Sequence, residues 1–126
     1  MAIQTLETVN FYCKALAQNS KFPLLKTMLC IGGINSKEPL SQIRNGVHIV
    51  VATPGRLSDL LNKKKLNLDI CKYITLDEAD RLLDLAFEEE IRNILDHFSV
   101  KIHYFSLLLK FLSGPKTNPV IFCHHA

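Results

Sequence analysis

The 126-residue sequence predicts an α/β fold in which helices flank a parallel β-sheet. Short apolar runs at residues 47–52 and 73–77 have the length and composition of buried strands. Stretches with apolar residues three and four positions apart lie between such runs, which is the spacing of amphipathic helices. Hydrophobic residues make up 48% of the chain, so it can supply the core of one ordinary domain.

Apolar spacing predicts helices over residues 6–17, 83–98 and 104–112, and turn residues place two more over 37–44 and over the segment after 56 through 61. The predicted strands are residues 27–31, 47–52, 73–77 and 119–123. Gly32-Gly33 ends the first strand, and Gly114-Pro115 closes the last helix. Ser36 can cap the second helix and Asn45-Gly46 can give it a left-handed exit. Strands alternating with helices indicate parallel connections.

Charge is distributed unevenly along the chain. The formal net charge is +3, but residues 77–96 carry eight acidic and two basic side chains, which leaves +9 for the rest. A basic surface outside that segment could meet a phosphate backbone. For the run Lys63-Lys64-Lys65 the alternative is that three lysines simply solvate a loop.

The cysteines do not predict a disulfide framework or a metal site. Cysteines 13, 30, 71 and 123 form no C-x-x-C pair, and most lie in apolar stretches where a reduced thiol acts as a small core residue. The Cys123-His124-His125 run lies on a predicted strand, where neighbours point to opposite faces, and no second ligand pair has suitable spacing. Neither a membrane span nor a signal peptide is recognisable, so we expect a soluble intracellular protein.

The acidic cluster Asp77-Glu78-Ala79-Asp80 follows a buried strand directly. Open α/β sheets bind ligands at the carboxyl ends of their strands, so these carboxylates would line that crevice. Asp77 can hold a magnesium ion, directly or through water, and Glu78 can orient and polarise an attacking water. Asp80 would contact another part of the site. The alternative is an ordinary acidic helix start, since carboxylates are favoured near the positive end of a helix dipole.

Three stretches in this order extend the pattern: "CIGG", "HIVVATPGRLSDLL" and "YITLDEADRLLDLAFEEEI". Together they resemble the DEAD-box family of ATP-dependent RNA helicases over roughly residues 4–98. Their residues are most similar to the Abstrakt branch of that family, which is associated with pre-messenger RNA splicing. The resemblance implies a partial RecA-like lobe of the P-loop NTPase type, with ATP and Mg²⁺ as cofactors. It also implies RNA and splicing-associated proteins as partners, and a nuclear location. Nothing indicates DNA binding.

The resemblance assigns roles to individual residues. It implies that Asp77 and Glu78 handle magnesium and the hydrolytic water, and that Asp80 links to a Ser-Ala-Thr motif. It places the RNA-backbone contacts on Gly32, Gly33, Thr53, Pro54, Gly55 and Arg56. The residue types suit that role because glycines let N–H groups approach phosphates, threonine offers a hydroxyl, and arginine offers a fork of donors. For "TPGRL" alone, an ordinary strand-to-helix turn remains the alternative.

Other parts of the family pattern do not occur in these 126 residues. No glycine begins a G-x-x-x-x-G-K-[ST] phosphate loop, and neither the Ser-Ala-Thr motif nor the arginine motif of the second lobe is recognisable. The sequence starts where the family's Pro-Thr-Arg-Glu-Leu motif ends. We therefore expect a partial first lobe over residues 1–98, lacking its P-loop strand, and a remnant resembling the start of the second lobe over residues 99–126.

These differences affect the expected activity. ATP binding by this chain alone should be weak or absent, and hydrolysis should not be coupled to strand separation. Without the P-loop strand, the strand 73–77 should have an apolar edge exposed, which predicts poor solubility. A non-catalytic RNA- or protein-binding module and a truncated gene product without function remain alternatives. Two smaller departures are Ala86, where the family has glycine, and Pro39, where a polar residue is common.

Overall fold

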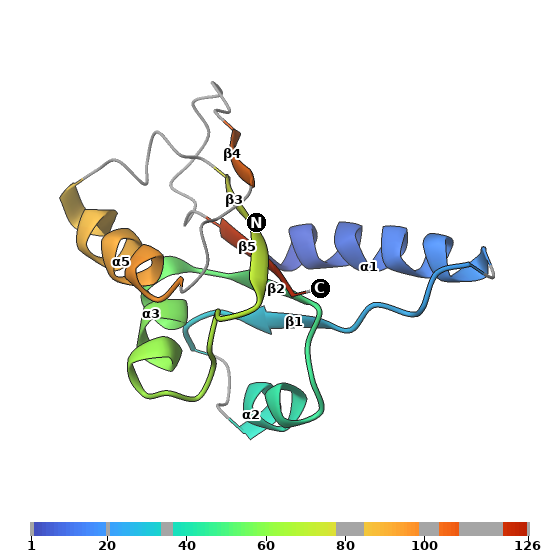
Figure 1. The fold of residues 1–126 in the computed structure, drawn as a ribbon, viewed down its shortest axis with the longest axis horizontal. Helices are drawn as coiled ribbons and strands as arrows, with labels where there is room; N and C mark the ends of the chain where they lie inside the picture. Colours follow the sequence, from blue (N-terminus) through green and yellow to red (C-terminus); the bar gives the residue numbers. More distant parts are fainter. Residues whose placement is uncertain are drawn as a thin grey trace.

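The computed structural model describes residues 2–19, 21–33, 37–77, 85–98, 104–108 and 120–125. It contains a five-stranded sheet with the order β1-β2-β5-β3-β4, flanked by helices (Figure 1). The strands are β1 (Thr27–Cys30), β2 (Ile49–Ala52), β3 (Cys71–Asp77), β4 (Tyr104–Leu108) and β5 (Val120–His125). The helices are α1 (Ala2–Gln18), α2 (Lys37–Arg44), α3 (Pro54–Asn62) and α5 (Leu85–Asp96).

Four of the five strands run in one direction. β1 pairs with β2 in parallel and β3 pairs with β4 in parallel, while β5 lies between β2 and β3 and is antiparallel to both. Ile121 of β5 lies opposite Ala52 on one side and Leu76 on the other. The carboxyl ends of β2 and β3 therefore reach the same edge of the sheet. The predicted α/β class is confirmed, but the parallel arrangement does not extend to β5.

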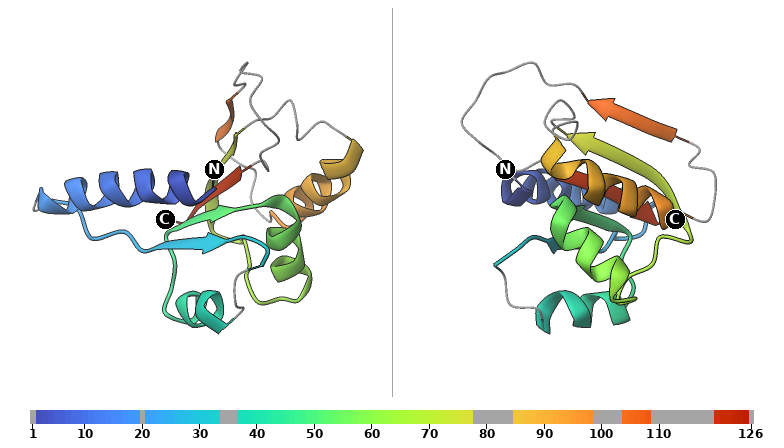
Figure 2. Two further views of the ribbon diagram at one scale, coloured as in Figure 1. Left: turned by 180° about the vertical axis from the view of Figure 1, so that it is seen from behind. Right: turned by 90° about the vertical axis from the view of Figure 1, so that its left-hand side faces the viewer.

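The helices form a layer on each side of the sheet. α3 and α5 pack side by side on one face, and α1 lies behind the sheet on the other (Figure 2). Val50 and Ala52 belong to the core under α3 and α5, while the equally buried Val51 alternates to the other face. The remaining core residues are Met28, Cys30, Leu57, Leu60, Leu61, Leu66, Leu68, Cys71, Ile74, Leu76 and Ile94. None of the helices described is long and apolar enough to cross a membrane.

Most predicted elements are confirmed, with small shifts at their ends. The second helix has the predicted bounds, and Gly46 has a φ of 78°, as its left-handed exit requires. α3 begins at Pro54, inside the "TPGR" segment. Pro39 lies in the first turn of α2, where a missing N–H costs nothing. Ser36, the predicted cap of this helix, lies outside the described residues.

The helix predicted over residues 104–112 is wrong at its start. Residues 104–108 form β4, which pairs with β3 in register from Tyr73 opposite Tyr104 to Asp77 opposite Leu108. Aromatic residues such as Tyr104 and Phe105 suit a strand, and backbone pairing with β3 outweighs the helical spacing. Residues 109–112 lie outside the described part of the chain.

Two further expectations concern β3 and Ala86. The exposed edge predicted for β3 is wrong, because β5 pairs with one side of this strand and β4 with the other. Ala86 lies in α5, and Lys64 is the one non-glycine residue with a positive φ in the part of the chain that is described. Ala86 therefore bears no left-handed strain. The division into residues 1–98 and 99–126 stays a prediction, although strands from both segments share this sheet.

Candidate functional site

Two of the sequence motifs meet at the carboxyl edge of the sheet. Gly32 and Gly33 follow β1, and Thr53 follows β2, its parallel neighbour. The backbone N–H of Thr53 donates a hydrogen bond to the carbonyl oxygen of Cys30 at 3.0 Å. This bond continues the β1–β2 pairing to the point where both strands end. It brings the Gly-Gly and Thr-Pro-Gly-Arg motifs side by side.

The start of α3 leaves hydrogen-bond donors open. Thr53 has the extended backbone of a helix N-cap (φ −88°, ψ 146°), yet its side chain makes no capping hydrogen bond. Leu57 N–H donates to the Thr53 carbonyl at 3.0 Å, the first bond of the helix, and Pro54 has no N–H to place. The N–H groups of Gly55 and Arg56 therefore lie in the first turn, where the helix dipole favours an anion.

The glycines keep this edge of the sheet open. Gly32, Gly33 and Gly55 are exposed, and a Cβ built on any of them would meet no atom within 4 Å. Gly33 has a φ of 82°, in the left-handed region that favours glycine. Gly32 and Gly55 lie outside that region, so nothing in the free chain requires glycine at either position. Close approach of another molecule is a physical reason for glycine at both.

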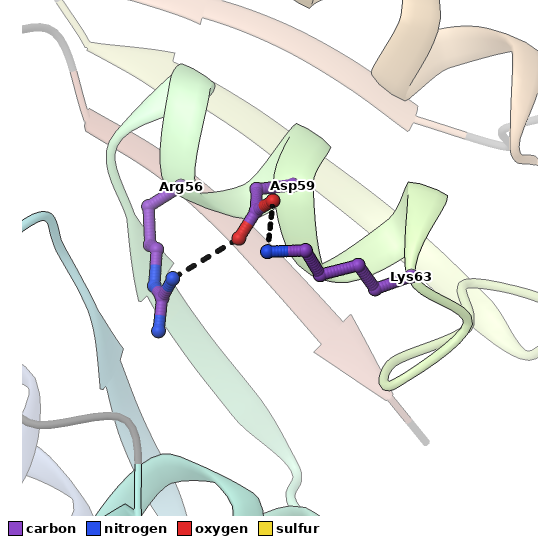
Figure 3. Close-up of polar contacts among 3 residues, drawn as sticks. All are labelled: Arg56, Asp59 and Lys63. Atoms are coloured by element: carbon purple, nitrogen blue, oxygen red, sulfur yellow. Dashed lines mark hydrogen bonds and ion pairs between the residues drawn. The ribbon is translucent and has the colours of Figure 1, made fainter.

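Arg56 is held by an acidic neighbour on its own helix. Its Nη1 lies 3.0 Å from Oδ2 of Asp59, whose Oδ1 lies 2.7 Å from Nζ of Lys63 (Figure 3). The Lys63 hydrogen bond, with help from the charges of Lys63 and Arg56, lowers the pKa of Asp59 below its usual value. Asp59 is thus ionised at neutral pH and draws the Arg56 side chain along α3. Arg56 keeps 20% of its side-chain surface exposed.

The predicted catalytic residues are described only in part. Asp77 ends β3, opposite Leu108 of β4 and Val120 of β5, at the same edge as Thr53. One strand separates β2 from β3, so the two strand ends lie about 10 Å apart, twice the usual strand spacing. Glu78 and Asp80 lie outside the described residues, as does the side chain of Asp77. Magnesium binds few carboxylates and keeps several waters, so a role for Asp77 as its ligand stays a prediction.

A polar network between α3 and α5 was not predicted. Asn93 Nδ2 donates to Ser58 Oγ at 2.7 Å and to Asn62 Oδ1 at 3.2 Å. His97 Nε2 lies 3.4 Å from the same Asn62 oxygen. Ser58 is buried, with 6% of its surface exposed. The network ties the helix that begins at the Thr-Pro-Gly-Arg motif to the helix that follows the acidic motif.

The contacts that were not predicted differ in whether a sequence pattern could have indicated them. The pairs of Asp59 with Arg56 and with Lys63 have spacings of three and four residues, which on a helix indicate neighbours. Asn93 and Ser58 are 35 residues apart, and no local pattern joins them.

Comparisons with known proteins agree on one family. A model of the DEAD/DEAH box helicase family matches residues 1–110. The probable ATP-dependent RNA helicase ddx41 of Dictyostelium discoideum is 54% identical over 99 residues, which are 79% of this chain and 15% of that protein. DEAD-box ATP-dependent RNA helicase 35 of Arabidopsis thaliana is 54% identical over 98 residues (78% and 16%). ATP-dependent RNA helicase abstrakt of Drosophila melanogaster is 49% identical over 98 residues (78% and 16%).

The fold agrees with the sequence match. The crystal structure of the yeast DEAD-box splicing factor Prp28 matches with a TM-score of 0.73 and 27% sequence identity, over 89% of this chain and 26% of that one. The chain spans only 15–16% of the length of the three relatives above. The predicted RecA-like fold and the resemblance to the Abstrakt branch are therefore confirmed. Because the family model covers most of its residues, this chain belongs to the DEAD/DEAH box helicase family.

Proposed function

We propose that this chain is the RNA-binding part of an ATP-dependent RNA helicase lobe. Alone, it binds the RNA backbone, and this binding is not coupled to ATP hydrolysis. The observation that carries the proposal is the 3.0 Å bond from Thr53 N–H to the Cys30 carbonyl, which aligns the Gly-Gly and Thr-Pro-Gly-Arg motifs at one edge. The family and the names of its relatives support RNA as the ligand.

A phosphate at the start of α3 would find several donors. The N–H groups of Gly55 and Arg56 point out of the helix end, and the Thr53 hydroxyl is not used for capping. The Arg56 guanidinium can add a charge-assisted pair of hydrogen bonds if it leaves Asp59. Gly32 and Gly33, on the neighbouring strand end, let a second part of the backbone approach closely. The contacts are to phosphate and sugar, so sequence preference should be weak.

The second part of the proposal concerns how ATP and magnesium would bind. Asp77 and Glu78 would hold the metal and orient a water, and Asp80 would contact a neighbouring motif, as the family pattern implies. Magnesium, when bound with ATP, neutralises charge on the phosphates. The sequence holds no G-x-x-x-x-G-K-[ST] loop to surround those phosphates with amides and a lysine. Binding of ATP by these residues alone should accordingly be weak.

The test compares two arginines that each pair with a carboxylate on their own helix. Arg56→Ala should weaken binding of a labelled oligouridine by about tenfold in fluorescence anisotropy, and adding Mg²⁺–ATP should change neither affinity. Arg92→Ala is the control, because Arg92 also pairs with a carboxylate, Glu88 at 2.8 Å, on a different helix. Equal losses from both substitutions would mean that only net charge matters. ATP turnover that disappears in Glu78→Gln would refute the uncoupled state.

We extend the proposal to location and partners. The match to a splicing factor, Prp28, supports a nuclear location and association with splicing proteins. A tagged chain that remains outside the nucleus would contradict this part of the proposal and leave the RNA contacts untouched.

A further inference from the structure

A hollow lies at the edge of the sheet opposite the candidate RNA site. It has a volume of about 590 Å³, within the range of pockets that bind small ligands or side chains. Most of its residues precede β2 or β3 or belong to α2 and the end of α3, and His97 follows α5, so it opens at the amino-terminal ends of these strands. In Figures 1 and 2, α2 and the loop after α3 lie together on this side of the sheet. The apolar lining is Ile43, Val47, Leu61, Leu66, Leu68 and Ile70.

The rim of this hollow is basic. Lys64 and Lys65 both line it, together with Asp69 and His97. Lys63, by contrast, is bound to Asp59 at 2.7 Å. In the described parts of the chain neither Lys64 nor Lys65 forms an ion pair, and Asp69 is the single acidic residue of the lining. An apolar floor with two lysines at the rim favours a ligand that carries both apolar and acidic groups.

Lys64 stands where glycine is normally found. Lys65 N–H donates to the Leu60 carbonyl and Lys64 N–H to the Leu61 carbonyl, both at 2.9 Å, which is the Schellman pattern that ends a helix. In this pattern the residue just after the helix cap needs a left-handed backbone. That residue is Lys64, which has a φ of 53°. A non-glycine residue there costs roughly 1 kcal/mol. Lysine is thus present at the rim despite a cost in stability, which points to a use for its side chain.

A neighbouring hollow extends the same surface. It has a volume of about 540 Å³ and shares Gly46 and Val47 with the first. Lys26 lines it and donates from Nζ to the Asn45 carbonyl, an acceptor without opposite charge, at 2.7 Å. Two adjoining hollows with basic residues suit an extended segment better than a compact ligand.

We propose that this amino-edge surface, Ile43 to Val47 with Leu61 to Ile70, docks a short peptide segment of a partner protein. The segment places a bulky apolar side chain over Leu61, Leu66 and Leu68, and its aspartates or glutamates face Lys64 and Lys65. The site lies at the opposite end of the strands from Gly32 and Thr53, so it does not depend on RNA binding. Charge complementarity with the rim favours this occupant over a nucleic acid, which would lack the apolar anchor.

The experiment uses three labelled peptides and the full 126-residue chain. The first carries Leu-Phe between aspartates, the second has lysines in place of the aspartates, and the third has alanines in place of Leu-Phe. Only the first should bind in fluorescence anisotropy. Lys64→Gly should weaken this binding by about tenfold and raise the melting temperature, so the loss cannot be due to unfolding. Lys63→Gln, which removes a charge that already has a partner, should bind as the unchanged chain does.

A second variant keeps the test decisive. Ile70 lines the hollow and is 60% exposed, so Ile70→Glu should fold normally while it repels the acidic peptide. Equal binding by Lys64→Gly and the unchanged chain, or equal binding of the acidic and basic peptides, would overturn the proposal. Displacement of the peptide by oligouridine would also overturn it, because the surface would then belong to RNA.

Discussion

Arg56 and Asp59 form an ion pair on α3, with 3.0 Å between Nη1 and Oδ2 (Figure 3). Lys63 holds the other oxygen of the same carboxylate. In the free chain Asp59 therefore occupies the guanidinium that the family pattern assigns to RNA. Under the proposed function a phosphate would compete with this carboxylate for Arg56, so we expect Asp59 to set the strength of RNA binding.

Asp59→Asn should strengthen RNA binding, because it releases Arg56 and removes the negative charge that pairs with this guanidinium on α3. Oligouridine binding measured across a salt series should gain affinity, and its log–log slope should steepen by about 0.7 if one more phosphate contact forms. Glu88→Gln, which releases Arg92 from its 2.8 Å pair on α5, is the control and should leave the slope unchanged. The interpretation fails if the two variants behave alike.

Gly55→Ala should make the chain more stable and a weaker RNA binder. Gly55 is exposed in the first turn of α3, and an added Cβ meets nothing within 4 Å, so alanine gains roughly 0.5–1 kcal/mol of helix stability. The same methyl group would hinder a phosphate at the N–H groups of Gly55 and Arg56. Chemical denaturation and oligouridine binding measure the two effects. Unchanged RNA binding in the stabilised variant would place the phosphate elsewhere.

Asn93→Ala should destabilise the packing of α3 against α5 by roughly 1–2 kcal/mol, because it leaves the buried Ser58 hydroxyl without its 2.7 Å donor. Ser58→Ala combined with Asn93→Ala should cost less than the two single losses added together. Urea denaturation of the four proteins gives this coupling. Gln42→Ala, at an exposed position on α2, should stay within about 0.5 kcal/mol of the unchanged chain. Strict additivity would show that the hydrogen bond contributes nothing.

Stability should fall in alkaline solution because of Cys30. Burial raises the pKa of this thiol from 9.0 to about 11. The charge of Arg56 lowers the pKa by a smaller amount, and the charge of Asp59 raises it. Between these values the unfolded chain ionises and the folded chain does not, so the free energy of unfolding should drop by roughly 1.4 kcal/mol per pH unit at most. Below pH 9 the contribution is fully retained.

The Cys30 prediction has its own control. In Cys30→Ala the slope of stability against pH should be shallower over the same range, even though the cavity lowers stability at every pH. Equal slopes in the two proteins would assign the alkaline loss to other groups.

Local patterns in the sequence were enough for several elements. The capping residue Ser36 and the Asn45-Gly46 exit predicted the helix over residues 37–44, which is α2, and Gly46 has the left-handed backbone expected at that exit. The three motifs could be placed at strand ends, since parallel strands present their carboxyl ends at one edge. Such features depend on residues within a few positions of each other, so the sequence shows them directly.

Contacts between residues distant in the sequence could not be predicted from local patterns. β5 pairs antiparallel between β2 and β3, and residues 104–108 form a strand although a helix was predicted. Both outcomes depend on which strands are available to pair. The Asn93 network and the amino-edge hollow likewise join segments that are distant in the sequence. The sequence by itself determined the motifs, the charge and the local backbone. Only the tertiary structure decided the pairing partners, because backbone hydrogen bonds form between any strands that packing brings together.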